Sequence, residues 1–332
     1  MPQVPRIWGP GRNPERPQTL PNRAEKLDSS ATGISVERIR YHGWPDSYLL
    51  ANGLVESVVV PAIGRVMQLR LKGEAEGVFW ENRALDGQLN YPSSSEWINF
   101  GGDKSWPAPQ SDWPARQGRA WPPPVAFDAL PAEATVTARG LTLTSPVDPG
   151  FGIQATRSIE LDKISPVLRI RTEYHKLAGA PLRASVWTIA QMRDPVRVFV
   201  LLPEKSKFPE GYLPLGGGEP AELKITGRLL SLRRSANASA KIGSEAASIV
   251  WVGPNAAVRI EAEPGPGEYP DGGCVTEVYT NPDPLPYVEL ETLGPLASMS
   301  IGDRIARTTR YTITRRSTPD VQAEASKLFS SR

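Results

Sequence analysis

The chain has 332 residues, of which 39% are hydrophobic and 22% charged, and its 38 basic and 36 acidic residues leave a formal net charge of +2. This composition is typical of a globular protein. Because the two signs of charge are interspersed and no apolar run approaches the length of a transmembrane helix, the sequence argues against a nucleic-acid-binding stripe and against a membrane span. Length alone allows two average domains or one large all-β domain.

Residues 1–34 are rich in Pro, Arg and Asn and contain no hydrophobic segment of a signal peptide. We expect an extended arm, with Trp8 as its anchor to the rest of the protein. The compartment stays open, because an export signal removed before this point would leave the same sequence.

Short runs of alternating apolar and polar residues begin near residue 35 and continue to residue 317. In one of them, Leu168 and Ile170 alternate with Arg169 and Arg171. A period of two predicts strands, and Gly, Pro, Asn and Asp mark the turns between them. The pattern predicts roughly fifteen or more strands.

The tail from 318 to 332 is the first segment with a helical pattern, and Thr318 or Asp320 can cap a short helix there. The sequence has neither a repeat of fixed period nor an internal linker, which argues against a propeller and against two tethered sandwiches. We therefore expect one all-β domain at 35–317, a large antiparallel sandwich of two many-stranded sheets.

The segment from Trp97 to Pro124 is dense in tryptophan and proline around Gly101-Gly102-Asp103-Lys104. Because Pro and Gly disfavour regular helix and strand, we expect a long loop. Such a loop either plugs a core with its tryptophans or lines a cleft, where a sugar ring stacks on an indole and its hydroxyls meet polar side chains. The four tryptophans are Trp97, Trp106, Trp113 and Trp121.

Cysteine and metal chemistry find little support in the sequence. Cys274 is the only cysteine, and we interpret it as a small buried residue. The His, Cys and carboxylate residues lack the spacing of a metal site. We expect neither a metal nor another cofactor.

Three segments, taken in order, resemble the galactose mutarotase-like superfamily. The first, 53–82, contains a strand, a Pro, a Gly64-Arg65 turn and a second strand. The second, NFGGDKSWPAPQ at 99–110, lies where mutarotases have His-Gly-Gly followed by Asp-Lys and Trp. The third, 287–304, resembles the Leu-Glu-Thr catalytic strand and the turn after it. The resemblance spans residues 35–316 and also extends to a family of domains of unassigned function with a GGDKxWPAPQ core.

This resemblance implies a β-supersandwich and a carbohydrate partner. Enzymes of the superfamily interconvert sugar anomers without a cofactor, with a Glu as general base and a His as general acid. It implies Glu291, in Leu290-Glu291-Thr292, as the base. By alternation Glu289 lies on the same face of that strand, as a partner or as a competing assignment for the base.

The family histidines have no counterpart in this chain, which contains only His42 and His175. We expect both to be structural. Trp187 stands at the position of the acid, and Asn99-Phe100 replaces the histidine of the Gly-Gly segment. This departure argues against ordinary mutarotation by the family mechanism.

Lys104 is the candidate for the vacant acid, because burial against an apolar wall lowers the pKa of a lysine. The alternative is a structural ion pair between Lys104 and Asp103. Arg65 is either a turn residue or a group that binds sugar hydroxyls. The candidate substrate-binding residues are Arg65, Asn99, Asp103, Trp106, Trp187, Gln191, Tyr279 and Glu289.

Three hypotheses for function remain, and the oligomeric state stays open. The first is an isomerase-like enzyme that acts at the anomeric carbon, with Glu291 as base and Lys104 as acid. The second is a lectin-like protein that keeps the cleft and has lost the acid. The third is an accessory sugar-recognition domain of the kind found beside catalytic domains in polysaccharide lyases and glycosidases. If Lys104 faces Glu291 across a space that fits a sugar ring, the enzyme is favoured; if Asp103 holds Lys104 away, the binding protein is favoured.

Overall fold

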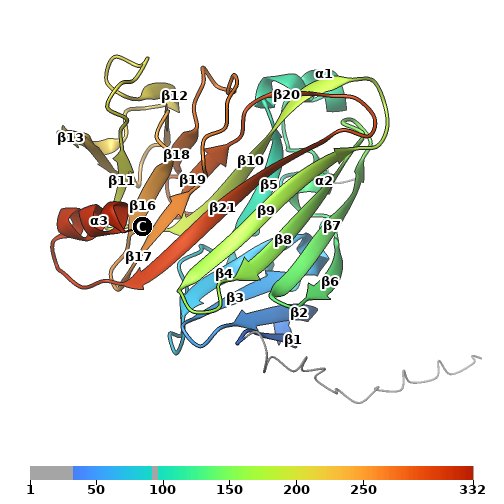
Figure 1. Cartoon of the computed structure of the whole chain (residues 1–332), viewed down its shortest axis with the longest axis horizontal. Coiled ribbons are helices and arrows are strands. Elements are labelled where there is room, and N and C mark those ends of the chain that lie inside the picture. Colours follow the sequence, from blue (N-terminus) through green and yellow to red (C-terminus); the bar gives the residue numbers. More distant parts are fainter. Residues whose placement is uncertain (1–32, 92–95, 332) are drawn as a thin grey trace, which may run out of the picture.

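A computed structural model describes residues 33–91 and 96–331 and contains two large antiparallel sheets packed face to face (Figure 1). The expected all-β sandwich is confirmed. The expected arm at 1–34 lies almost wholly outside the described residues, since only its last two positions are described.

The first sheet has eleven strands within the described residues, and ten of them form one continuous order. In space they run β1 (Ser35–Tyr41), β2 (Trp44–Ala51), β3 (Val55–Val60), β4 (Arg65–Leu71), β5 (Asp103–Ala108), β10 (Leu182–Arg193), β19 (Tyr287–Leu293), β18 (Thr276–Thr280), β15 (Ala240–Ser244) and β12 (Leu213–Gly217). The short β20 (Ala297–Met299) pairs with β10.

The second sheet has ten strands in the described part of the chain. They run β13 (Ala221–Thr226), β14 (Leu229–Arg233), β11 (Arg197–Leu201), β16 (Ser248–Val252), β17 (Ala256–Glu261), β21 (Arg304–Arg315), β9 (Val167–Lys176), β8 (Ile153–Leu161), β7 (Gly140–Asp148) and β6 (Glu133–Thr137). The helical segments are α1 (Trp113–Gln117), α2 (Val125–Asp128) and α3 (Val321–Ser330), with single 3₁₀ turns η1 (Pro61–Ile63), η2 (Arg83–Leu85) and η3 (Gln110–Asp112).

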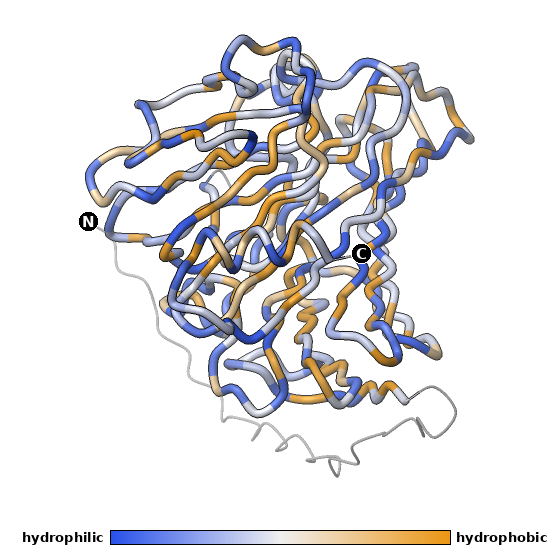
Figure 2. The backbone as a smooth tube through the Cα atoms, turned by 60° about the vertical axis from the view of Figure 1, so that its left-hand side comes forward, coloured by the Kyte–Doolittle hydropathy of each residue, from blue (hydrophilic) through white to orange (hydrophobic). Residues whose placement is uncertain are grey.

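The main core lies between the two sheets. Hydrophobic and hydrophilic residues alternate along the strands that enclose it (Figure 2). Val278 and Leu290 of the first sheet belong to the same buried cluster as Ile159, Ile170 and Tyr311 of the second. This arrangement follows from the period of two, which sends every second side chain of a strand to the same face.

Helix α3 packs on the outer side of the second sheet. Ala325 and Leu328 contact Phe199 and Val250 there. Asp320 caps the helix, because its side chain accepts the backbone N–H groups of the second and third helical residues. No helix within the described ranges is long and apolar enough to cross a membrane.

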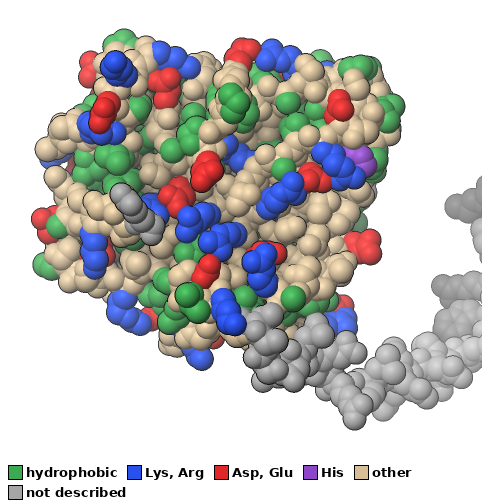
Figure 3. Space-filling model, in the orientation of Figure 1, with side chains coloured by type: hydrophobic (Ala, Val, Ile, Leu, Met, Phe, Trp, Pro, Cys, Tyr) green, Lys and Arg blue, Asp and Glu red, His purple; other side chains and the backbone are tan. Residues whose placement is uncertain are grey.

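The outer face of the second sheet carries basic and acidic side chains next to one another (Figure 3). Glu173 accepts hydrogen bonds from Arg171 and Arg304, and Glu261 pairs with Arg310. This face is therefore solvated and largely neutralised.

Strand β5 lies inside the segment for which the sequence predicted an irregular loop, and that prediction is wrong for Asp103–Ala108. β5 pairs with β10 along its whole length but with β4 only at Asp103. Pro107 is tolerated because β5 has a free edge at that point, where a missing N–H breaks no ladder.

Two glycines fix the approach to β5. Gly101 and Gly102 have φ of 92° and 72°, in the region that favours glycine. A Cβ on Gly101 would lie 2.2 Å from the Trp80 carbonyl oxygen, and one on Gly102 would lie 2.5 Å from that of Val66. No larger residue fits these two positions without moving the backbone.

The tryptophans of this segment pack on one another. The Trp106 ring contacts Trp97, Trp113, Trp121 and Trp187 at centroid distances of 5.3–6.2 Å. Trp106 and Trp113 are buried, whereas Trp121 is exposed. For Trp106 and Trp113 the observed environment is that of a core.

Candidate functional site

Strand register decides which side chains share the outer face of the first sheet, on the side away from the main core. Glu289 of β19 lies opposite Gln191 of β10 and Tyr279 of β18. Glu291 lies opposite Glu277 of β18. Because side chains of paired residues point to the same face, these five residues form two neighbouring rows.

Lys104 and Asp103 point to opposite faces of β5, as neighbours on a strand must. Lys104 lies on the outer face and donates to Glu289. The Asp103 carboxylate lies between the sheets, where it binds Arg157 and Tyr311. The predicted alternative of a Lys104–Asp103 ion pair is therefore wrong, and Asp103 lies away from the outer face on which it was expected to bind substrate.

Glu291 is the most central carboxylate of the outer face and is fully buried, with 0% exposure. Its Oε2 accepts hydrogen bonds from Trp187 Nε1 at 2.6 Å and from Lys241 Nζ at 3.0 Å. Its Oε1 is buried and has no hydrogen-bond donor among the described residues. One oxygen is thus held and the other is available to a ligand hydroxyl.

Lys241, on β15, joins two carboxylates. Its Nζ lies 2.6 Å from Glu277 Oε2 as well as 3.0 Å from Glu291 Oε2. Burial lowers the pKa of Lys241, but the charges of Glu291 and Glu277 outweigh burial and raise that pKa above its usual value. Lys241 is therefore a firmly held ammonium.

Glu277 and Asp271 lie beside one another next to Lys241. Burial, together with the charges of Glu291 and Asp271, raises the pKa of Glu277 well above its usual value, although Lys241 opposes this shift. Burial also raises the pKa of Asp271. Asp271 has a φ of 52°, which is uncommon for a residue other than glycine.

Lys104 is fully buried, with its Nζ 3.3 Å from Glu289 Oε1 and 4.8 Å from the centre of the Trp106 ring. Burial lowers the pKa of Lys104, and the charge of Glu289 opposes that shift. Lys104 and Glu291 stand on either side of β10. Two strand spacings separate their backbones by about 10 Å, which leaves room for a sugar ring only if intervening side chains move.

Arg65 is held by the segment that covers the sheet. It donates to Asp128 Oδ1 at 2.8 Å, to the Asp128 carbonyl oxygen at 3.1 Å and to the Gly101 carbonyl oxygen at 2.7 Å. Trp106 Nε1 donates to the same Asp128 oxygen at 2.9 Å. These contacts are those of a residue that ties the covering segment down, which is a different role from the predicted binding of hydroxyls.

Two buried side-chain amides, those of Asn99 and Gln191, lie near Glu289 and Tyr287. No polar side-chain atom of Asn99 or Gln191 has a hydrogen-bond partner of normal geometry among the described residues. Both lie beside the Tyr287 hydroxyl, whose pKa is raised by burial and by Glu289. Buried polar atoms without partners are costly, so these amides are suited to ligand hydroxyls. Tyr279 is less available, since its hydroxyl donates to Asn281 Oδ1.

Both histidines lie away from Glu291. His42 is in the turn between β1 and β2, and His175 pairs with Gln154 in the second sheet. Cys274 is buried, and burial raises the pKa of its thiol to about 12, as suits a small unreactive residue. Within the described ranges no group of three or more His, Cys, Asp or Glu residues is arranged to hold a metal ion.

Sequence reasoning missed Lys241, Glu277, Asp271 and Tyr287. The signal for Glu277 was present, because Glu277 and Tyr279 alternate in the strand before the Glu289 and Glu291 strand. Antiparallel pairing of these two strands would have placed all four side chains on one face. Lys241 had no such local signal.

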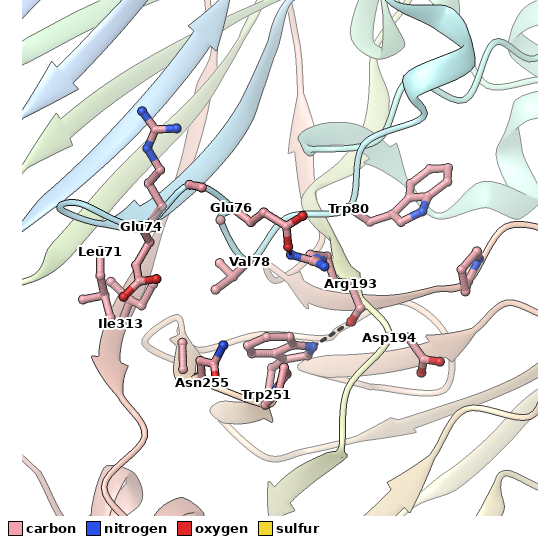
Figure 4. A pocket seen from close by; sticks show the side chains of 16 residues that line it. Leu71, Glu74, Glu76, Val78, Trp80, Arg193, Asp194, Trp251, Asn255 and Ile313 are labelled. Atoms are coloured by element: carbon pink, nitrogen blue, oxygen red, sulfur yellow. Dashed lines mark hydrogen bonds and ion pairs between the residues drawn. The ribbon is translucent and has the colours of Figure 1, made fainter.

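Two cavities lie near this face, and neither is lined by Glu277, Glu289 or Glu291. One, of about 500 Å³, lies at the far end of β10 and contains Trp80, Trp251 and Arg193 (Figure 4). Its polar groups are largely paired, since Arg193 binds Glu76 and Trp251 Nε1 donates to the Arg193 carbonyl oxygen. Another, of about 680 Å³, contains Asp271.

Comparison with solved structures shows the fold. The chain is similar to a candidate aldose 1-epimerase from Klebsiella pneumoniae subsp. pneumoniae, with a TM-score of 0.59, 10% identity, and coverage of 94% of this chain and 92% of that one. It is similar to a galactose mutarotase-like protein from Lactobacillus casei, with a TM-score of 0.52, 10% identity, and coverage of 80% and 99%. A TPR-domain containing protein from Parabacteroides distasonis matches with a TM-score of 0.55, 13% identity, and coverage of 83% and 48%.

The chain therefore spans about half the length of the Parabacteroides protein and nearly all of the other two. No protein-family model and no curated protein matches the sequence. The resemblance to the galactose mutarotase-like superfamily is confirmed as a likeness of fold. Fold alone does not assign an activity, so the function rests on the side chains of the site.

Proposed function

We propose that this protein binds a carbohydrate on the outer face of the first sheet, above Glu291, and acts at its anomeric carbon. The observation that carries the proposal is the state of the Glu291 carboxylate. Trp187 and Lys241 fix one oxygen, and the other is buried with no donor among the described residues. A carboxylate fixed in this way accepts a proton from a hydroxyl without having to reorient.

Ring opening at the anomeric carbon needs a base for the anomeric hydroxyl and an acid for the ring oxygen. Carboxyl and ammonium groups supply both proton transfers. Glu291 is the base of the proposal. The acid is a side chain other than histidine, and Lys104, chosen from the sequence, lies on the same face with its pKa lowered by burial.

Hydroxyl groups of the sugar find partners around Glu291. The amides of Asn99 and Gln191 each offer a donor and an acceptor. Glu289 reaches the surface with 11% of its side chain exposed, and Lys241 with 21%. Because Glu291 is fully buried, the ligand reaches it only when a covering side chain moves aside.

A non-catalytic sugar-binding protein is the second candidate, and Trp187 favours it. An indole N–H donates a hydrogen bond but does not transfer its proton. Trp187 therefore holds Glu291 but does not replace the acid of the family. A protein with this arrangement alone would still bind the sugar and would not catalyse anomer exchange.

Proton NMR of anomer exchange over a panel of sugars tests the first candidate. We expect the protein to accelerate exchange of at least one sugar, and Glu291→Gln to reduce that rate by about 100-fold or more. Glu173→Gln, on the outer face of the other sheet, is the matched control and should keep the rate. Exchange at the buffer rate for every sugar would exclude the enzyme.

Glycan-array binding separates the second candidate from no sugar binding at all. A lectin-like protein keeps binding after Glu291→Gln and loses it after Trp97→Ala. Trp97 is the residue to change, because Trp106 is buried in the aromatic cluster and its removal would disturb folding. An array with no bound glycan would contradict both candidates.

A further inference from the structure

Glu277 and Glu291 form a buried carboxyl pair across neighbouring strands. They are register partners on β18 and β19, so their Cβ atoms are about 5 Å apart. Neither oxygen of Glu277 nor Oε1 of Glu291 has a hydrogen-bond partner of normal geometry among the described residues, and the charge of Glu291 is one of the causes that raise the pKa of Glu277. Both carboxyl groups are at most 1% exposed. Two carboxylates this close in a dry environment share a proton, because they cannot both ionise cheaply.

The surroundings distinguish the two members of the pair. Glu291 accepts two hydrogen bonds, from Trp187 and from Lys241. Glu277 faces the single cation of Lys241 and, on its other side, the carboxyl group of Asp271. The proton of the pair therefore belongs on Glu277.

A cavity of about 680 Å³ lies next to this pair, with Asp271 between them, although neither glutamate lines it. Its lining includes Asp271, whose carboxyl lies beside Glu277, and Val275, which directly precedes β18. Tyr269 and Pro109 also line the cavity and offer a flat surface to a sugar ring. The volume is in the range of small-molecule sites.

We propose that Glu277 is the general acid that partners Glu291, and that the sugar approaches through the cavity lined by Asp271. This inference rests on the proposed function, since it assigns the second proton transfer of the same reaction. It replaces Lys104, which is on the far side of β10 and engaged with Glu289.

The step balances within the two carboxyl groups. Glu291 Oε1 takes the proton of the anomeric hydroxyl as the bond between C1 and the ring oxygen breaks, and Glu277 gives its proton to that ring oxygen. The open-chain aldehyde turns about its C1–C2 bond. On ring closure the ring-oxygen proton returns to Glu277, and Glu291 returns its proton to the new anomeric hydroxyl. Lys241, 2.6 Å from Glu277 Oε2, stabilises the carboxylate that Glu277 becomes in between.

The raised pKa of Glu277 supports this assignment, because a neutral carboxyl group at about pH 7 has a proton to give. The titratable groups that face it are Lys241 on β15, Glu291 on β19, and Asp271 and Cys274 in the segment before β18. Among these only Lys241 favours ionisation of Glu277.

Anomer-exchange NMR on the wild-type protein and its variants tests the inference. We expect Glu277→Gln to lower kcat by about 100-fold while KM changes by less than about threefold, and Glu277→Asp to recover part of the rate. The alkaline limb of the wild-type pH profile, where Glu277 loses its proton, should disappear in Glu277→Gln. Glu173→Gln is again the control.

A second measurement needs no variant. The side-chain carboxyl ¹³C shift of Glu277 in the wild-type protein should be that of a protonated acid at about pH 7. An ionised Glu277 at that pH would overturn the inference, and so would a Glu277→Gln variant with the wild-type rate and profile. If Lys104→Met abolishes exchange while Glu277→Gln does not, Lys104 is the acid and the proposed function stands. A wild-type protein without exchange on any sugar overturns both.

Discussion

Two buried charged clusters lie on opposite faces of the same sheet, and they differ in how fully their carboxylates are bound. Between the sheets, one oxygen of Asp103 binds Arg157 and the other binds Tyr311, so both are used within the protein. On the outer face, Glu291 has one oxygen bound twice and one without a donor among the described residues. Burial is nearly the same in the two clusters, so burial alone does not distinguish them.

A structural cluster therefore differs from a reactive one in whether every carboxylate oxygen has a hydrogen-bond partner within the protein. Asp103 connects β5 of the first sheet to β8 and β21 of the second. Glu291 has the same burial but keeps an acceptor free, which costs stability and is worthwhile only if a ligand uses it.

The largest effect is expected between the sheets. Arg157→Met leaves the Asp103 carboxylate buried with its main counter-charge removed, so we expect the free energy of unfolding to fall by about 3–5 kcal/mol. Urea denaturation measures this. Arg171→Met, on the solvated face of the second sheet, should change stability by less than about 0.5 kcal/mol. Equal losses in the two variants would show that the Asp103 cluster is not structural.

A smaller effect is expected at the outer face. Trp187→Phe removes the N–H group that holds Glu291 Oε2 at 2.6 Å. A hydrogen bond to a charged group is worth about 1.5–3 kcal/mol, so we expect anomer exchange to slow by about tenfold or more.

The matched control for that variant is Trp113→Phe. Trp113 Nε1 donates to the Pro107 carbonyl oxygen at 2.9 Å, within the same aromatic cluster. This change should lower stability by about 1 kcal/mol and leave the exchange rate within about twofold. If both variants slow exchange equally, packing and not the bond to Glu291 sets the rate.

The smallest effect concerns pH and stability. The pKa of Glu277 is raised above its ordinary 4.5, so the native state keeps a proton that the unfolded chain has lost. The contribution of Glu277 to stability is therefore complete below pH 4.5 and declines as pH rises toward its native pKa. Asp271 and Glu289 act in the same direction, because their pKa values are also raised.

Glu277→Gln removes this part of the pH dependence. We expect the free energy of unfolding of the wild type to fall more steeply with pH than that of the variant, between about pH 5 and 8, in urea titrations at several pH values. Parallel curves for the two proteins would contradict a protonated Glu277.

The sequence was sufficient for the class of fold and for one strand of the site. Alternation and turn residues are local signals, and they predicted the sandwich and placed Glu289 and Glu291 on one face. The Asp103–Lys104 pair was misjudged because Pro107 and the glycines suggested a loop. Had those residues been taken as a strand, alternation would have separated their side chains.

Lys241 and Glu277 could not be found in the same way. Their place beside Glu291 depends on the order β19-β18-β15, and on the register of each pair. Such pairing joins residues 14 to 50 positions apart, and it is decided by the packing of the whole sheet. Local pattern contains no information on it.

Gly101 and Gly102 determine which face of the sheet each side chain of β5 points to. Side chains along a strand alternate between the two faces of the sheet. Removal of one glycine would therefore move every side chain from Asp103 onward to the opposite face. A lysine would then meet Arg157 in the core, and an aspartate would meet Glu289 on the outer face. Both exchanges bring like charges together. The insertion or deletion of a single residue before β5 is therefore not tolerated.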